Sequence, residues 1–192
     1  MLSEYKTALP LVTAADAQTD AKELLETAQK KMGFIPNMYK AMANSPGLLN
    51  TYLKGYAAFR ENSGFSPIEQ EVIFLTISHS NGCEYCMAAH SFLAEAASGV
   101  PKGVTEAIRD AKQIPEVKLR ALSIFTEVML TRHGLPSKAD VELFLKAGYQ
   151  EKDILEIIHA IAVKTISNYT NHIFHTDLDG AFSKHLWNDA SH

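Results

Sequence analysis

The sequence contains few cysteines, no long apolar runs and no excess of positive charge. Two Cys in 192 residues are too few for a secreted scaffold held together by disulfides. No stretch approaches the roughly 18 uninterrupted apolar residues that a membrane-spanning helix needs. The first residues, MLSEYKTALP, lack the apolar core of a signal peptide. We therefore expect a soluble, cytoplasmic protein that has no membrane partner.

The charge balance argues against a nucleic-acid partner. The formal net charge is -4 and the sequence pI is about 6.0, so no basic surface is expected that could neutralise a phosphate backbone. Hydrophobic residues make up 46% of the chain, enough to bury a full core. We expect residues 1–192 to form one domain. It would comprise an N-terminal helical extension over about 1–62, a core over about 63–113 that contains both cysteines, and C-terminal helices over about 114–192.

The apolar residues recur at helical spacing and rarely alternate as in strands, which predicts an all-α fold. One helix start is especially complete, because Ser66 can cap, Pro67 takes the first helical position and Glu69 completes a capping box. Further helices are expected after Pro101, Pro115 and Ser137. The other predicted helices run from about Asp20 to Met32, Ser66 to His79, Cys83 to Ser98 and Glu151 to Asn171.

The segment HSNGCEYCMAAHSF, residues 79–92, contains both cysteines and a histidine four residues later. At about 100° per residue, Cys83, Cys86 and His90 share one face of a helix. The Asn81-Gly82 turn predicts an antiparallel hairpin with the preceding helix, where Glu71 borders the apolar face. This hairpin would carry Glu71 toward His90.

Such a group of residues can support thiol redox chemistry. A helix N-terminus and a neighbouring imidazolium both stabilise a thiolate, and two cysteines three residues apart can close a disulfide after a small adjustment. A carboxylate on the far nitrogen of His90 would fix its tautomer and raise its basicity.

A metal site is the competing interpretation, with Cys83, Cys86 and His90 as ligands and His79 as a fourth. Structural zinc sites usually draw on two ligand pairs, and no second pair is evident, so we expect no metal. His172 and His175, near the predicted end of the last long helix, are interpreted as capping or interface residues. No cofactor is expected.

The spacing of Glu71, Cys83, Cys86 and His90 resembles the core signature of the AhpD-like alkylhydroperoxidase and carboxymuconolactone decarboxylase superfamily. Most of the chain is similar to its peroxidase-related branch, through GFIPNMYKAMANSPGLLNTYL, SPIEQEVIFLTISHSNGCEYCMAAH and LPSKADVELFLKAGYQEKDILEIIHAIAVKTISNYTNHI. The sequence differs from related chains at Tyr85, where some members have histidine, and at His172, where many have arginine.

The resemblance implies a compact AhpD-like subunit that assembles into trimers or hexamers and reduces hydrogen peroxide or organic hydroperoxides. It also implies that Cys86 attacks the peroxide and forms a sulfenic acid, that Cys83 resolves it as a disulfide, and that Glu71 and His90 relay protons. A dithiol reductant, in the best-known members a dihydrolipoyl protein, would then reduce the disulfide.

Two other functions stay open at this level. The same cysteines would suit a dithiol/disulfide oxidoreductase or adaptor that acts on a partner protein. They would also suit a helical oligomeric binding or metal-holding module without enzyme activity.

Overall fold

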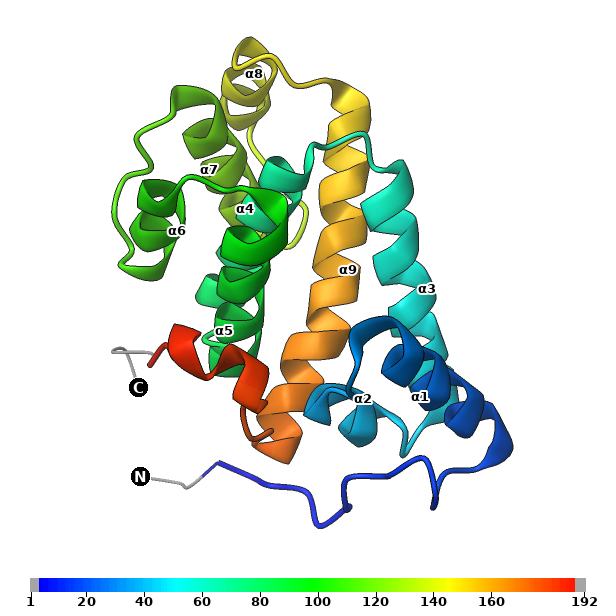
Figure 1. The fold of residues 1–192 in the computed structure, drawn as a ribbon. Helices are drawn as coiled ribbons and strands as arrows, with labels where there is room; N and C mark the ends of the chain where they lie inside the picture. The colour runs from blue at the N-terminus through cyan, green and yellow to red at the C-terminus, as the bar shows by residue number, and fades with distance from the viewer. Residues whose placement is uncertain (1–3, 189–192) are drawn as a thin grey trace.

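The computed structural model describes residues 4–188, and all regular secondary structure in this range is helical (Figure 1). The all-α prediction is therefore confirmed. The elements are α1 Thr19–Met32, α2 Asn37–Met42, α3 Pro46–Asn62, α4 Pro67–Ser80, α5 Glu84–Leu93, a π-helical turn Ala94–Ser98, α6 Lys102–Arg109, α7 Val117–Thr131, α8 Lys138–Lys146, α9 Glu151–Phe174 and a 3₁₀ turn Gly180–His185. None of the described helices has the length and apolar character needed to cross a membrane.

The start of α4 follows the sequence signal closely. The Glu69 N–H donates to Ser66 Oγ at 3.3 Å, and the Ser66 N–H donates to the Glu69 carboxylate at 2.9 Å. Pro67 is the first helical residue, where its missing N–H has no cost. The start of the helix that carries Glu71 is thus fixed by local chemistry.

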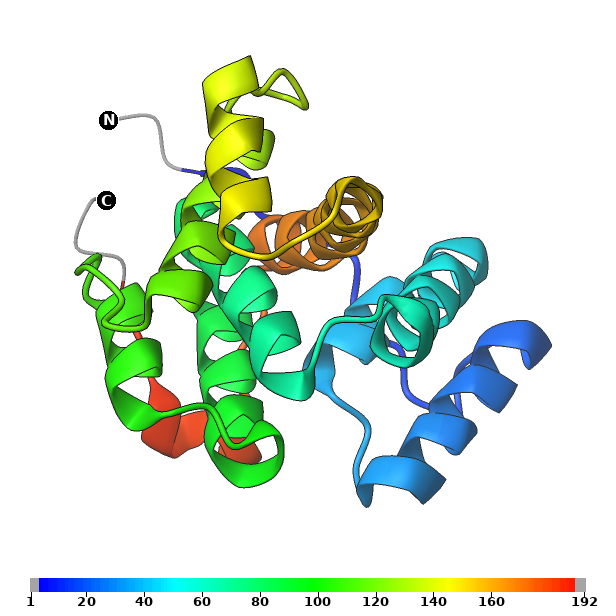
Figure 2. The same cartoon turned by 90° about the horizontal axis from the view of Figure 1, so that it is seen from above.

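Helix α4 is buried on nearly every side. Its residues 70–78 are all buried, including the consecutive apolar run Val72 to Leu75. Figure 2 shows the surrounding helices, and α4 contacts α5, α6, α7 and α9. The sequence predicted one apolar stripe on this helix with Glu71 at its border. In the structure the buried surface extends past that border, and Glu71 itself is 0% exposed.

The helix expected over residues 83–98 changes its winding. Regular α5 ends at Leu93, and a π-helical turn continues to Ser98, where Gly99 ends it at φ 66°. Glycine suits this left-handed position because it has no Cβ. Ser98, in this turn, reaches back to the carboxylate of Glu71 at 3.3 Å.

Helix α9 packs closely against α3 and is longer than expected, ending at Phe174. At Gly55 in α3 an added Cβ would lie 3.0 Å from Val163 Cγ2, so the missing side chain permits this close approach. The N-terminal segment crosses the lower end of α9 in Figure 1, where the Thr7 N–H donates to the Ile173 carbonyl at 2.9 Å. The 3₁₀ turn, which was not expected from the sequence, packs on α5.

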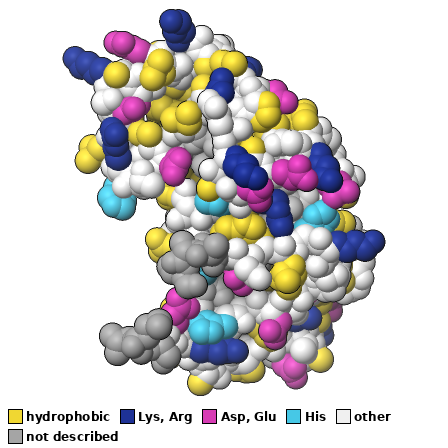
Figure 3. Space-filling model, turned by 90° about the vertical axis from the view of Figure 1, so that its left-hand side faces the viewer, with side chains coloured by type: hydrophobic (Ala, Val, Ile, Leu, Met, Phe, Trp, Pro, Cys, Tyr) yellow, Lys and Arg dark blue, Asp and Glu magenta, His cyan; other side chains and the backbone are white. Residues whose placement is uncertain are grey.

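An apolar surface lies beside α7 and α8. Val117, Ile124 and Leu143 are exposed and line a groove of about 410 Å³ between α7 and α8. Figure 3 shows hydrophobic side chains gathered toward the upper end of the molecule, where α7 and α8 lie in Figure 1. The trimer or hexamer implied by the resemblance stays a prediction.

Candidate redox site

The hairpin of α4 and α5 brings Glu71 and His90 into contact. The turn between the helices passes through Gly82 at φ 64°, and the two helices then run back along each other. Glu71 Oε2 lies 2.8 Å from His90 Nδ1. The proximity that the sequence suggested is therefore present.

Glu71 is a buried carboxylate with three partners. Arg60, from α3, donates to Oε1, Ser98 donates to the same oxygen, and His90 contacts Oε2. Burial alone would raise the pKa of Glu71, but His90 and Arg60 outweigh it and hold the pKa below its usual value. An ionised carboxylate can only accept, so the hydrogen lies on His90 Nδ1 and the Nε2 lone pair is left as a base.

The cysteines lie at the start of α5. Cys83 is the N-cap residue, with φ -88° and ψ 92°, and Cys86 is in the first turn. Both are free thiols, with exposed fractions of 0% and 2%. The Asn171 side-chain N–H, from α9, lies 3.3 Å from Cys86 Sγ and 3.9 Å from Cys83 Sγ. Both sulfurs therefore face the same part of α9.

The two sulfurs have opposite acidities. Burial raises the pKa of the Cys86 thiol, but a hydrogen bond from Cys83 and the positive charge of Lys164 outweigh it and bring the pKa well below its ordinary value. Burial and the hydrogen bond to Cys86 raise the pKa of Cys83 well above its ordinary value. The arrangement favours a Cys86 thiolate beside a Cys83 thiol.

His90 differs from the imidazolium expected from the sequence. Burial lowers its pKa, the charge of Lys164 lowers it further, and the attraction of Glu71 opposes both without cancelling them. The imidazole is therefore neutral near neutral pH. It is suited to accept a proton.

Three buried polar residues of α9 were missed by the sequence interpretation. Lys164, Asn168 and Asn171 recur at helical spacing, and Asn171 contacts both sulfurs. A sequence signal existed, because Lys164 follows the largely apolar run IIHAIAV within the last long helix. A lysine at such a position marks either a solvated face or a buried charge, and only the packing of α9 distinguishes the two.

Tyr85 binds the C-terminal segment through its hydroxyl. Its hydroxyl donates to the Asp179 carboxylate, which also accepts the Asn37 N–H at 3.1 Å. Tyr85 thereby connects α5 to the C-terminal segment and the start of α2.

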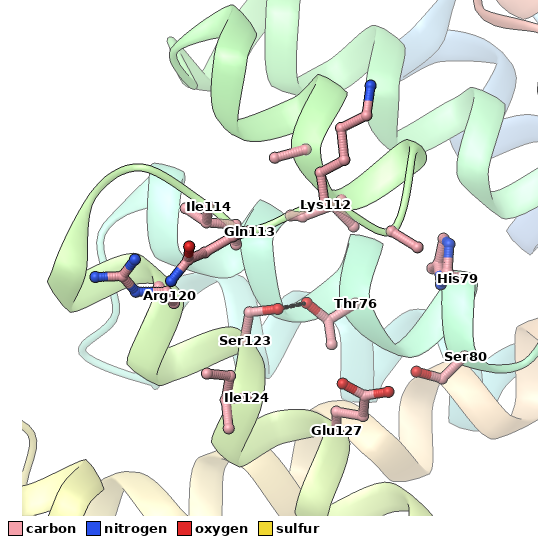
Figure 4. Close-up of a pocket in the computed structure, with 13 residues that line it drawn as sticks. Thr76, His79, Ser80, Lys112, Gln113, Ile114, Arg120, Ser123, Ile124 and Glu127 are labelled. Atoms are coloured by element: carbon pink, nitrogen blue, oxygen red, sulfur yellow. Dashed lines mark hydrogen bonds between the residues drawn. The ribbon is translucent and has the colours of Figure 1, made fainter.

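His79, His172 and His175 lie outside this group. The His79 ring packs at a tilt against Trp187, with ring centres 5.3 Å apart, and lines a groove of about 370 Å³ between α4, α6 and α7 (Figure 4). None of Glu71, Cys83, Cys86 and His90 lines that groove. His175 ends α9 at φ 47°, and the ring of His172 stacks on Tyr169. Within residues 4–188 no group of three or more His, Cys, Asp or Glu is arranged to hold a metal ion.

Comparison with known proteins finds a family match over part of the chain. Residues 46–114 match the Carboxymuconolactone decarboxylase family. This range contains α3, α4 and α5, and with them Glu71, both cysteines and His90. A search of curated proteins found no match.

Solved structures share the fold over nearly the whole chain. One is described as an alkylhydroperoxidase AhpD core, an uncharacterized peroxidase-related protein from Ralstonia eutropha JMP134, with TM-score 0.79, 22% identity, and 94% of this chain and 96% of that chain covered. A peroxidase-related protein from Silicibacter sp. TM1040 has TM-score 0.76 and 24% identity, with 95% and 97% covered. A variant of the debrominase Bmp8 in complex with 2,3,4-tribromopyrrole has TM-score 0.75 and 18% identity, with 95% and 97% covered. These structures show that the chain has the AhpD-like fold that the resemblance implied, and the family match covers the segment that carries Glu71, both cysteines and His90.

Proposed function

We propose that this chain, which has an AhpD-like fold and a segment that matches the Carboxymuconolactone decarboxylase family, is a thiol-dependent peroxide reductase. The observation that carries the proposal is the pair of free cysteine sulfurs that share the Asn171 amide at the start of α5, one turn before a histidine held by Glu71. A thiolate is the nucleophile that attacks a peroxide oxygen, and a nearby thiol is needed to resolve the product.

The reaction needs one external proton. Cys86 sulfur attacks the peroxide and the O–O bond breaks, which gives a sulfenic acid and an alcohol, or water from hydrogen peroxide. Cys83 sulfur then attacks Cys86 sulfur and releases water. Overall, one thiolate, one thiol, one hydroperoxide and one proton give a disulfide, an alcohol and water.

His90 is the group suited to move the protons. Its free Nε2 can take the proton of Cys83 as this sulfur attacks, and can return it to the leaving hydroxide. Glu71 holds the ring through Nδ1 and stabilises the imidazolium that forms briefly. A dithiol, such as a dihydrolipoyl group, would then reduce the disulfide by exchange.

Peroxide turnover and sulfenic acid trapping test the proposal. With hydrogen peroxide and a dithiol reductant, the wild-type protein should consume peroxide faster than the dithiol alone. Cys86→Ser should abolish this excess rate, because no thiolate is left to attack. Cys83→Ser should form a sulfenic acid on Cys86, seen by mass spectrometry after trapping, without intramolecular disulfide formation. A wild-type rate equal to that of the free dithiol would exclude the function.

Burial distinguishes peroxide from larger substrates. A protein disulfide cannot reach a sulfur that is 2% exposed unless the covering segments move, whereas hydrogen peroxide is little larger than water. The dithiol/disulfide exchange function is therefore the second candidate. Fast reduction of a protein disulfide without peroxide turnover would favour it. Because Bmp8 is a debrominase, a bromopyrrole is a useful third substrate in the same assay.

A further inference from the structure

Lys164 is a buried amine that acts on Cys86. Its side chain is 0% exposed, and its Nζ has no hydrogen bond of good geometry within the described residues. Its charge and its approach to the Cys86 sulfur nevertheless lower the pKa of that thiol. Burying an uncompensated ammonium costs several kcal/mol of folding free energy, so such a group is rarely kept for stability. A buried ammonium at this position is stabilised only by a nearby anion.

The carboxylate nearby is already engaged. Glu71 is paired with Arg60 on one oxygen and with His90 on the other. Lys164 Nζ instead lies 5.6 Å from the centre of the Phe74 ring, against which His90 also packs at 4.9 Å. Lys164 and His90 thus contact the same ring, and the charge of Lys164 acts on His90, which lies one turn beyond Cys86.

The remaining titratable groups around Cys86 cannot supply the positive charge. Tyrosine hydroxyls from α3 and α5 have raised pKa values and stay neutral, and so does the Cys83 thiol. The titratable groups that interact with Cys86 or with His90 are Tyr52, Tyr56 and Arg60 of α3, Glu71 of α4, the N-cap Cys83, Tyr85 and His90 of α5, and Lys164 of α9. Since Arg60 is neutralised by Glu71, Lys164 is the cation left to balance a thiolate.

We propose that Lys164 is the fixed positive charge of the redox site, which holds Cys86 as a thiolate and His90 as a neutral base. The two effects have one cause, because a nearby ammonium attracts the sulfur anion and repels the imidazolium. The Asn171 N–H, two turns further along the same helix, lies 3.3 Å from the Cys86 sulfur and donates to it. Lys164 therefore acts as a positioning residue whose charge keeps both the nucleophile and the base deprotonated.

The functional meaning rests on the proposed peroxide reduction, but the electrostatic claim does not. Attack and proton transfer require an anion and an empty base at the same pH. A free cysteine titrates near 8.5 and a free histidine near 6.5. Between these two values an isolated histidine is already neutral, but an isolated cysteine still keeps its proton and is no nucleophile. A positive charge that lowers both pKa values extends, toward acid pH, the range in which Cys86 is a thiolate and His90 is neutral.

The test is the titration of both groups in three variants. We expect Lys164→Met to raise the pKa of Cys86 by about one unit or more, measured from the pH dependence of alkylation in a Cys83→Ser background, where Cys86 is the sole thiol. The pKa of His90, measured by NMR, should rise in the same variant. Lys164→Arg should keep both values near those of wild type. Lys152→Met, an exposed lysine at the start of α9, is the matched control and should change neither.

The titration separates this role from a structural one, because a lysine that only fills space would leave the pKa values of Cys86 and His90 near those of wild type. Thermal unfolding of Lys164→Met, measured beside the titration, checks that the variant is folded. Unchanged titration of Cys86 and His90 in Lys164→Met would overturn the inference, whatever the peroxide activity. If Lys164→Met does not fold, Lys164→Gln takes its place with the same criterion. Raised pKa values in a protein without peroxide turnover would support the inference and exclude the proposed function.

Discussion

Glu71 is the residue on which the charges of the site converge. It accepts from Arg60, Ser98 and His90 while fully buried, so its removal leaves the guanidinium without its partner and the imidazole without a fixed tautomer. The sequence placed Glu71 near His90 through the hairpin. It gave no sign of Arg60, which comes from a different helix.

We expect Glu71→Gln to destabilise the fold by about 3 kcal/mol, because breaking a buried ion pair strands its partner. Urea denaturation measures this, with the exposed Glu61→Gln at the end of α3 as control. The folded pKa of Glu71 lies below its unfolded value, so its contribution is full above the unfolded pKa and is lost as pH falls through the folded pKa. The free energy of unfolding of Glu71→Gln should therefore fall less than that of wild type as the pH is lowered. An equal acid slope in both proteins would contradict the assignment.

At the scale of the element, α4 and α5 are defined by local signals that the sequence displays. Ser66, Pro67 and Glu69 start α4, and the Asn81-Gly82 turn separates it from α5. These signals act between residues close in the chain, which is why the boundaries could be predicted to within a residue or two. The π-helical turn after Leu93 has no comparable local signal, and it was missed.

The Ser66 cap offers a test at this scale. Ser66→Ala should lower the free energy of unfolding by about 1 kcal/mol, since the Glu69 N–H loses its acceptor. Ser137→Ala, which removes the same kind of cap from α8, should cost a similar amount. Neither variant should shift the pH dependence of Cys86 alkylation, because both caps lie apart from the sulfurs. A shift in Ser66→Ala alone would mean that the start of α4 positions Glu71 more tightly than we infer.

At the scale of the whole molecule, the sulfurs are enclosed by segments far apart in the sequence. α2 contributes Met38, α3 contributes Tyr52 and α9 contributes Asn171, and all are buried with Cys86. The described structure thus exposes the thiolate very little. Access must depend on size or on motion of these segments.

Size selectivity follows from this enclosure. Relative to a free thiol, Cys86 should react with hydrogen peroxide at least about tenfold faster than with bulky cumene hydroperoxide, which corresponds to about 1.4 kcal/mol of extra barrier for the larger molecule. Stopped-flow oxidation of the protein with each peroxide gives the ratio of the two rate constants. The same measurement on dithiothreitol gives the ratio for a freely accessible thiol. A protein ratio equal to that of dithiothreitol would mean that the site opens freely.

The sequence by itself determined the helical class, the helix starts and the facing of Cys86 and His90, because these depend on periodicity and on contacts within a few residues. It also indicated the hairpin that joins Glu71 to His90. Only the tertiary structure decided that Arg60 engages Glu71, that Lys164 lies within the core, and that Cys86 rather than Cys83 is the more acidic thiol. These outcomes depend on burial and on charges from α3 and α9, and the electrostatic effect of a charge is set by its distance and surroundings in space rather than by its place in the chain.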